Sequence, residues 1–236
     1  MGKEIHSASE RKNWFIYDGY IHRANVFLDG NIIFNEAFPL KKYIDGPPWL
    51  KSYDEIQYQL GIYEYSANLL EEITEKKILD IGCGNGRKTI DFFREAEIIG
   101  LEIEPILSYL KDKYPSITWL ESDFENPPQG FFPIIICSDV IEHIVDPDDL
   151  LDFIAKINFG ICVISTPDRN TLQNRPGRSW DSNAGPPRNS THLREWSYEE
   201  FSSYIGSRFH IIDHRHCDEV DYKSQLVCFR NISINE

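Results

Sequence analysis

The chain has 236 residues, a formal net charge of −14 and a pI of about 4.9. This length suits one large domain, or a core domain with a small extension, and it can bury a full core without disulfides or metals. Hydrophobic residues make up 41% and charged residues 26%, and the composition excludes disordered, collagen-like and helical membrane-spanning classes. Because an acidic surface repels nucleic acid and anionic lipid, we expect no nucleic-acid partner and no membrane insertion.

The cysteines and the first residues indicate a cytoplasmic protein. No two cysteines form a CxxC pair, and three of them lie inside apolar, strand-like runs, as reduced buried thiols do. The sequence MGKEIHSASERKNWF is polar and lacks the apolar core of a signal peptide.

The N-terminal region predicts a β-hairpin. Residues 14–38 are rich in Tyr, Ile, Phe and Val, and Asp29-Gly30 lies between NVFL and NIIF. Pro47-Pro48 then marks a boundary. We therefore predict an extension over residues 1–52, which caps the site or forms a homodimer face, and a main domain over residues 53–236.

The main domain alternates between strand and helix patterns after a first helical segment between Tyr53 and about Thr74. The predicted strands are KKILDIG, EIIGLEI, ITWLES, PIIICSD and GICVIST, and the predicted helices between them cover residues 87–94, 106–113 and 148–157. Short β-branched runs separated by helices predict an open α/β sheet covered on both faces.

The tail of the chain departs from this alternation. SYEEFSSYI predicts a helix with Ser197 as its N-cap, and FHIIDHRH and SQLVCFR follow it as two strands with no helix between them. Two strands without a crossover helix predict an antiparallel pair at the sheet edge.

A glycine-rich turn lies between the first strand of the main domain and the next helix. Gly82, Gly84 and Gly86 have the spacing GxGxG, which permits a tight turn and a close approach of backbone to ligand. The GxGxxG fingerprint of dinucleotide sites and the GK[ST] ending of phosphate loops are both absent. The turn therefore predicts a ligand without phosphate.

Acidic residues at strand ends complete this pattern. Glu102 lies twenty residues beyond Gly82 and is placed to accept hydrogen bonds from ribose hydroxyls. Asp123 with Phe124 suits an adenine, since the acid accepts the exocyclic amine while the ring is sandwiched. Asp80, beneath the glycine turn, can face an ammonium group.

These segments together resemble the class I S-adenosylmethionine-dependent methyltransferases. ILDIGCGNG is similar to the first motif of that family, GLEIEP to its ribose-binding acid and ESDFEN to its adenine-binding turn. CSDVIEHIVDP, STPDRN and HLREWSYEEF resemble the small-molecule branch that includes the ubiquinone-pathway O-methyltransferases. The resemblance covers residues 53–230 and implies a Rossmann-like, mostly parallel seven-stranded sheet with an antiparallel edge strand and helices on both faces.

The resemblance also implies S-adenosylmethionine as the cofactor and assigns residues to it. The cofactor-binding residues that it implies are Asp80, Gly82, Cys83, Gly84, Asn85, Gly86, Glu102, Ile103, Asp123, Phe124, Ser138, Asp139 and Val140.

Methyl transfer to a hydroxyl needs a group that removes a proton. His143, in DVIEHI, and His192, in NSTHLREWS, are the two candidate catalytic bases, and the alternative for His143 is that it only holds its loop. Asp139 and Asp168 follow strand ends where catechol-type methyltransferases hold Mg²⁺, but Asn170 stands one place late for that pattern, so we expect no metal.

A second group of histidines lies in the penultimate predicted strand. His210, His214 and His216 would share one face of a regular strand, beside Cys217 and Asp218. No partner pair of ligands occurs elsewhere, so we interpret the group as part of a surface strand.

A long polar segment between Pro167 and Arg194 predicts an acceptor-binding loop that recognises negative charge. The candidate substrate-binding residues in it are Arg175, Arg178, Trp180, Arg188 and Arg194. The alternative is a solvated loop whose arginines pair with the acidic body of the protein.

The sequence thus predicts a methyltransferase that acts, through oxygen, on a small or medium polar acceptor such as a glycan, a sugar nucleotide or another anionic metabolite. Two alternatives stay open: an N-methyltransferase of a small amine, and a non-catalytic protein that binds S-adenosylmethionine.

Overall fold

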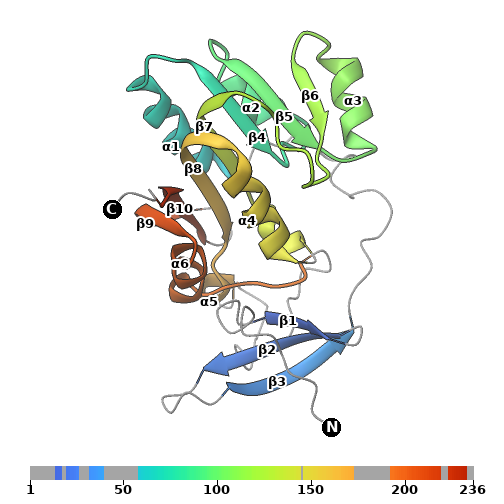
Figure 1. Cartoon of the computed structure of the whole chain (residues 1–236), viewed down its shortest axis with the longest axis vertical. Helices are drawn as coiled ribbons and strands as arrows, with labels where there is room; N and C mark the ends of the chain where they lie inside the picture. The colour runs from blue at the N-terminus through green and yellow to red at the C-terminus, as the bar shows by residue number, and fades with distance from the viewer. Residues whose placement is uncertain are drawn as a thin grey trace.

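The computed structural model describes residues 14–17, 20–26, 32–39, 58–144, 146–172, 192–218 and 223–232, the first three ranges by backbone alone. Its main feature is a seven-stranded sheet with the order β6-β5-β4-β7-β8-β10-β9 (Figure 1). The strands are β4 (Lys77–Ile81), β5 (Glu97–Glu102), β6 (Thr118–Glu121), β7 (Phe131–Ser138), β8 (Asn158–Pro167), β9 (Phe209–Asp218) and β10 (Lys223–Asn231).

The strand directions confirm the predicted open α/β sheet. β6, β5, β4, β7 and β8 pair in parallel, whereas β10 pairs antiparallel with both β8 and β9. The predicted antiparallel pair is therefore present, but β10 inserts beside β8 and β9 forms the edge. Because parallel strands end at one side of a sheet, the segments that follow β4, β5, β7 and β8 gather along the same edge.

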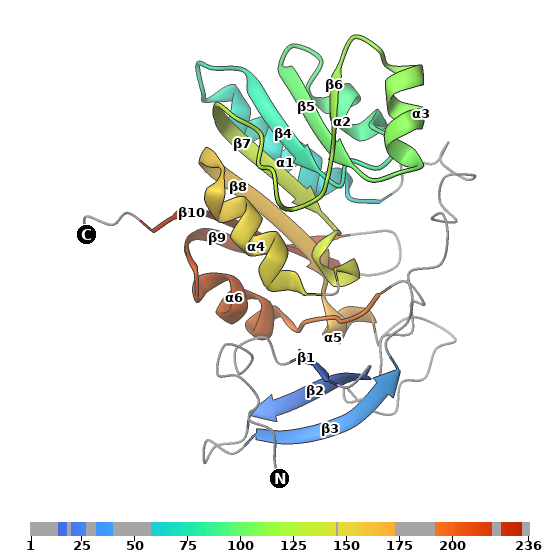
Figure 2. The same cartoon turned by 45° about the vertical axis from the view of Figure 1, so that its right-hand side comes forward.

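Helices cover both faces of the sheet (Figure 2). On one face lie α4 (Pro147–Lys156) and α6 (Tyr198–Gly206), and on the other α1 (Leu60–Glu71) and α2 (Arg87–Phe92). The remaining helices are α3 (Ile106–Lys113), against β5 and β6, α5 (Arg169–Leu172) and the 3₁₀ turn η3 (Ile141–His143). No helix in these described ranges is long and apolar enough to cross a bilayer.

Side chains of β4 alternate between the two faces of the sheet and so pack against the helices on both sides. Leu79 and Ile81 pack in the cluster beneath α4 and α6, while Ile78 packs toward α1 and α2. Asp80 shares the face of Ile78, because alternate side chains of a strand point to opposite faces. A carboxylate is thereby buried at the end of the strand, under the glycine turn.

The histidines of β9 do not share one face, as a regular strand would predict. The register between β9 and β10 shifts between Cys228 and Phe229, where Ile212 is the extra residue of a β-bulge. Ile211 lies against Gly206 of α6, and beyond the bulge His214 stacks on Tyr198 of the same helix. Because the extra residue reverses the alternation, His210 lies on the opposite face from His214 and His216.

A separate three-stranded sheet contains β1 (Trp14–Tyr17), β2 (Tyr20–Val26) and β3 (Ile32–Pro39). The predicted hairpin corresponds to the antiparallel pair β2 and β3, and the Asp29-Gly30 turn lies outside the described residues. β1 pairs antiparallel with β2, which the sequence pattern did not predict.

Candidate functional site

The glycine turn after β4 holds three left-handed residues: Gly82 at φ 71°, Gly84 at φ 57° and Gly86 at φ 72°. A Cβ on Gly82 would lie 2.4 Å from Cγ2 of Val140, so this position accepts no side chain. A Cβ on Gly84 would meet no atom of the described residues within 4 Å. Gly84 therefore presents open backbone on the side where a ligand is expected, while Gly82 fixes the turn against the segment after β7.

The Glu102 carboxylate is tied to this turn. One oxygen accepts a hydrogen bond from the Gly84 N–H at 2.8 Å, and the other accepts one from the Ile103 N–H at 2.9 Å. Burial raises the pKa of Glu102 to about 7, although these two hydrogen bonds lower it. A carboxylate has about four acceptor positions, so two remain for ribose hydroxyls.

Asp80 is fully buried below the turn. Its Oδ2 accepts hydrogen bonds from the hydroxyls of Tyr63 in α1 and Thr89 in α2, whereas Oδ1 has no partner among the described residues. Burial raises the pKa of Asp80 to about 6. A buried carboxylate oxygen without a donor is costly, and a cationic ligand would satisfy it.

The other residues of the turn contribute through backbone or packing. The Cys83 side chain is buried beside α3 and Trp119, so only its backbone faces the turn. The Asn85 side chain accepts a hydrogen bond from the Arg87 N–H at 3.0 Å, and Ile103 is 40% exposed. A Cβ on Gly86 would lie 2.9 Å from both Leu110 and Trp119, so this glycine allows the turn to pack on α3.

Asp123 closes the turn that follows β6. Its two oxygens accept hydrogen bonds from the backbone N–H groups of Glu125 and Asn126 and from the Asn126 side chain, and these bonds lower the pKa of Asp123. Phe124, at φ 57°, is half-buried and lies 5.6 Å from the Phe153 ring, centroid to centroid. Of the two residues predicted to bind adenine, Asp123 is therefore an exposed acid in a turn that its own hydrogen bonds stabilise, and the Phe124 ring beside it packs on Phe153.

The segment after β7 is joined to the end of β8. Ser138 and Ser165 share a hydrogen bond of 3.0 Å between their hydroxyls, and the Ser165 hydroxyl donates to Asp139 Oδ1 at 2.7 Å. Asp139 stands at φ 53°, and burial raises its pKa. Val140, against Gly82, completes the predicted set on this side.

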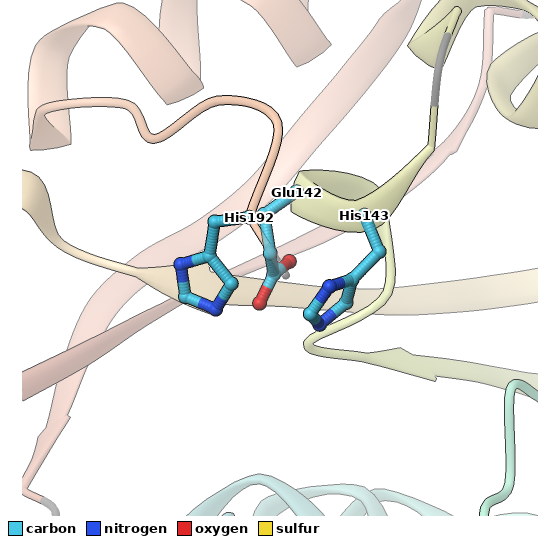
Figure 3. A group of neighbouring side chains, drawn as sticks. All are labelled: Glu142, His143 and His192. Carbon is cyan, nitrogen blue, oxygen red and sulfur yellow. The ribbon is translucent and has the colours of Figure 1, made fainter. Parts of the chain in front are cut away.

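The structure brings the two candidate bases together. The rings of His143 and His192 lie edge to face with centroids 5.0 Å apart, although they come from η3 and from the segment before α6. Glu142 lies with them, and one ligand atom from each of the three side chains falls within 4.8 Å of the others (Figure 3). We refer to Glu142, His143 and His192 as the Glu-His-His group.

Glu142, which the sequence did not indicate as a site residue, is fully buried. Its Oε2 accepts a hydrogen bond from the Thr166 hydroxyl at 3.1 Å, and Oε1 has no partner among the described residues. Burial, together with the nearby Asp139 charge, raises the pKa of Glu142 well above its usual range. The signal in the sequence that could have indicated Glu142 is its position directly before the candidate base His143. The Glu-His-His group could hold a divalent cation or move a proton.

Asp168 does not join Asp139. Its Oδ2 lies 2.8 Å from Nε2 of His216, and its Oδ1 accepts a hydrogen bond from the Asn170 N–H at 2.9 Å. The carboxylate therefore connects the end of β8 to β9, and it gives His216 a structural contact that the sequence did not predict.

Arg194, predicted to contact the acceptor, lies buried within the protein. Its side chain is 1% exposed and donates to the Ile144 carbonyl at 2.8 Å, and burial lowers its pKa to about 10. Arg194 therefore ties the segment before α6 to the residue that follows η3. The other candidates, Arg175, Arg178, Trp180 and Arg188, lie outside the described residues.

Comparisons with known proteins agree with this arrangement. A family model described as a methyltransferase domain matches residues 55–205. The ubiquinone biosynthesis O-methyltransferase of Rickettsia bellii is 31% identical over 109 residues, which cover 42% of this chain and 45% of that protein. The chain therefore matches less than half the length of this curated relative.

Solved structures show the same fold at low sequence identity. Magnesium protoporphyrin IX methyltransferase from Synechocystis PCC 6803 has a TM-score of 0.56 to this chain, with 16% identity over 73% of this chain and 82% of that one. An S-adenosylmethionine-dependent methyltransferase from Clostridium acetobutylicum has a TM-score of 0.54 with 14% identity over 72% of this chain and 92% of that one.

Proposed function

Since this chain belongs to the methyltransferase domain family and is an S-adenosylmethionine-dependent enzyme, we propose that it methylates an oxygen of a small or medium polar, anionic acceptor. The observation that supports oxygen as the target is the Glu-His-His group. Glu142 and His143 of this group follow the carboxyl end of β7, at the same sheet edge as the glycine turn after β4.

The residues at this edge fit the cofactor. Oδ1 of Asp80, which has no partner in the part of the chain that the structure describes, suits the ammonium of the methionine part, and the open side of Gly84 leaves room for it. Glu102 has acceptor positions left for the ribose, and Asp123 with Phe124 would hold the adenine. When bound, S-adenosylmethionine supplies an activated methyl group and a neutral leaving group.

The chain's own task is to position the acceptor and to remove its proton. A neutral imidazole of His143 or His192 can accept the proton of a hydroxyl held between them, and general-base catalysis contributes about 10²- to 10⁴-fold. An amine acceptor loses its proton more readily and needs such a group less. Replacing His143 and His192 singly by Gln tests this: loss of kcat by about 100-fold or more supports oxygen as the target, and unchanged kcat supports the amine alternative.

The Glu-His-His group also offers the ligand atoms of a cation site, which is a second way to acidify a hydroxyl. The sequence-based expectation is turnover without metal. Dialysis against a chelator, followed by assay with and without Mg²⁺, distinguishes the two. Activity that survives the chelator supports the histidine base. Activity that is lost and restored by Mg²⁺ assigns the group to a cation.

The anionic character of the acceptor rests on the segment between Pro167 and Arg194, in which arginines outnumber acids. Guanidinium groups bind carboxylate and phosphate in a bidentate manner, which favours a glycan, a sugar nucleotide or a similar metabolite. The decisive experiment is a calorimetric titration with S-adenosylmethionine, followed by an acceptor screen read by mass. Cofactor binding with no methylated product from any acceptor would favour the non-catalytic alternative.

A further inference from the structure

Glu195 lies behind the His192 ring. Its Oε1 is 2.8 Å from Nδ1 of His192, and its Oε2 accepts a hydrogen bond from the Arg169 guanidinium at 3.2 Å. All three side chains are at least nine-tenths buried. We propose that Glu195 is a positioning residue that fixes the proton of His192 on Nδ1 and so leaves the lone pair on Nε2, the ring nitrogen nearer to Glu142 and His143.

The chemistry of the contact sets the position of the proton. Arg169 is always a cation and only donates, and Oε2 of Glu195 accepts its hydrogen bond. A carboxylate paired with a guanidinium in this way has only acceptor atoms. Nδ1 must therefore carry the hydrogen that the carboxylate accepts. In a neutral imidazole the other nitrogen, Nε2, then has the lone pair.

The orientation of the His192 ring determines where the lone pair of the Nδ1–H tautomer lies. In Figure 3 the nitrogen of His192 beside Cγ, which is Nδ1, lies on the side of the ring away from Glu142 and His143, whereas Nε2 lies nearer to them. The backbone holds this orientation, because the Leu193 N–H donates to the Glu142 carbonyl at 2.8 Å and the Arg169 N–H donates to the Trp196 carbonyl at 3.0 Å. The lone pair of Nε2 can then accept an acceptor's proton or bind a cation.

This inference rests on the proposed function for its purpose, but its test needs no acceptor. The ¹⁵N shifts of His192, assigned by the signals that disappear in His192→Gln, report which nitrogen carries the proton in the neutral ring at about pH 8.5, well above the ordinary histidine pKa. We expect the Nδ1–H form in the wild-type chain with a chelator present. The Nε2–H form in the wild-type chain would overturn the proposal.

Glu195→Gln gives a sharper expectation. Since Arg169 only donates, the new amide must turn its oxygen to Arg169 and its NH₂ to Nδ1, which moves the proton of His192 to Nε2. Glu199→Gln, an exposed acid in the first turn of α6, is the matched control and keeps the wild-type form. A folded Glu195→Gln protein that keeps the proton on Nδ1 would contradict the proposal, and the wild-type measurement decides it if that variant does not fold.

A titration with S-adenosylhomocysteine separates this inference from the proposed function. We expect Glu195→Gln to bind it as the wild type does, and to lose about 100-fold or more in kcat with the acceptor found in the screen. If the wild-type chain does not bind S-adenosylhomocysteine, that result counts against the proposed function and not against the role of Glu195. A normal kcat in a Glu195→Gln protein whose tautomer has inverted would overturn the positioning role.

Discussion

At the scale of single residues, the candidate site depends on groups in unfavourable environments that a ligand would relieve. Asp80 is fully buried, with one oxygen that has no donor among the residues described, and Glu102 is buried with its pKa raised to about 7. Gly84 occupies left-handed backbone beside open space. The two buried acids cost free energy of folding without a ligand, whereas glycine adopts left-handed backbone without steric penalty and here leaves space for one.

The first prediction concerns Gly84. Gly84→Val places a branched side chain in the open space and in left-handed backbone, so we expect binding of S-adenosylhomocysteine to be abolished. Gly130→Val is the matched control, because Gly130 also has a positive φ and open surroundings but precedes β7 at the other end of the strand. Calorimetric titration measures both, and normal affinity in Gly84→Val would contradict the assignment of the turn.

The second prediction concerns Glu102 and pH. Its pKa is raised from 4.5 to about 7, so the folded chain binds more protons than the unfolded chain between these values. The contribution of Glu102 to the free energy of unfolding is therefore present at low pH and is lost as pH rises through this window. The loss is on the order of 1–3 kcal/mol. Urea unfolding from pH 5 to about pH 8 should show a weaker fall in stability for Glu102→Gln than for wild type.

Glu104→Gln provides the comparison for that series, since Glu104 is an exposed carboxylate two residues away. We expect it to follow the wild-type curve. Equal slopes for wild type and Glu102→Gln would show that Glu102 is not the group responsible.

At the scale of elements, the ends of strands and helices carry the site, and their capping fixes its position. α6 begins with a capping box in which Ser197 and Glu200 each bond the other's backbone N–H. The segment just before it carries His192 and Glu195, and Tyr204 of α6 donates to Asp148 of α4. The capped start of this helix therefore fixes the segment that carries His192, one of the two candidate bases.

The third prediction tests this start. Ser197→Ala removes the side-chain acceptor for the Glu200 N–H and should lower the free energy of unfolding by about 1 kcal/mol. Ser203→Ala, at an exposed position of the same helix, should change it little. The measurement is urea denaturation of both variants, and equal midpoints would show that the cap contributes nothing.

The fourth prediction concerns the polar segment before α6. Replacing Arg175 and Arg178 by Ala should raise the acceptor's KM by about tenfold or more, because a charge-assisted hydrogen bond contributes roughly 1.5–3 kcal/mol. Lys replacements should restore only part of the affinity, since the bidentate fork is lost. Steady-state kinetics with the acceptor from the screen measures this, and cofactor affinity should not change. Unchanged acceptor kinetics in the double Ala variant would reject this pair as the charge-reading residues.

At the scale of the whole molecule, the separate three-stranded sheet and the seven-stranded sheet suggest two parts. We propose the boundary between residues 52 and 53, with the first part as a cap over the site or a homodimer face. The match to the methyltransferase domain family begins at residue 55, which supports this division.

The fifth prediction follows from that boundary. A chain of residues 53–236 should fold and bind S-adenosylhomocysteine as the whole chain does, because every proposed cofactor contact lies beyond residue 53. Sedimentation and acceptor kinetics then distinguish the two roles of the first part. Loss of a dimer indicates an interface, and a raised acceptor KM in a monomer indicates a cap. A fragment that cannot bind the cofactor would place the boundary elsewhere.

The sequence by itself determined the features that arise from neighbouring residues. The order of strands and helices, the glycine turn, the capped start of α6 and the antiparallel pair at the end of the chain all follow from local spacing. The boundaries of α3 coincide with the predicted helix over residues 106–113, because its apolar positions recur at helical intervals.

Only the tertiary structure decided which distant residues meet. It placed His143 beside His192, set Glu195 and Arg169 behind that ring, and buried Arg194. It also moved His210 to the other face of β9 through the bulge at Ile212. These outcomes depend on strand register and on loops packed from separate parts of the chain, and a pattern read along the sequence contains neither.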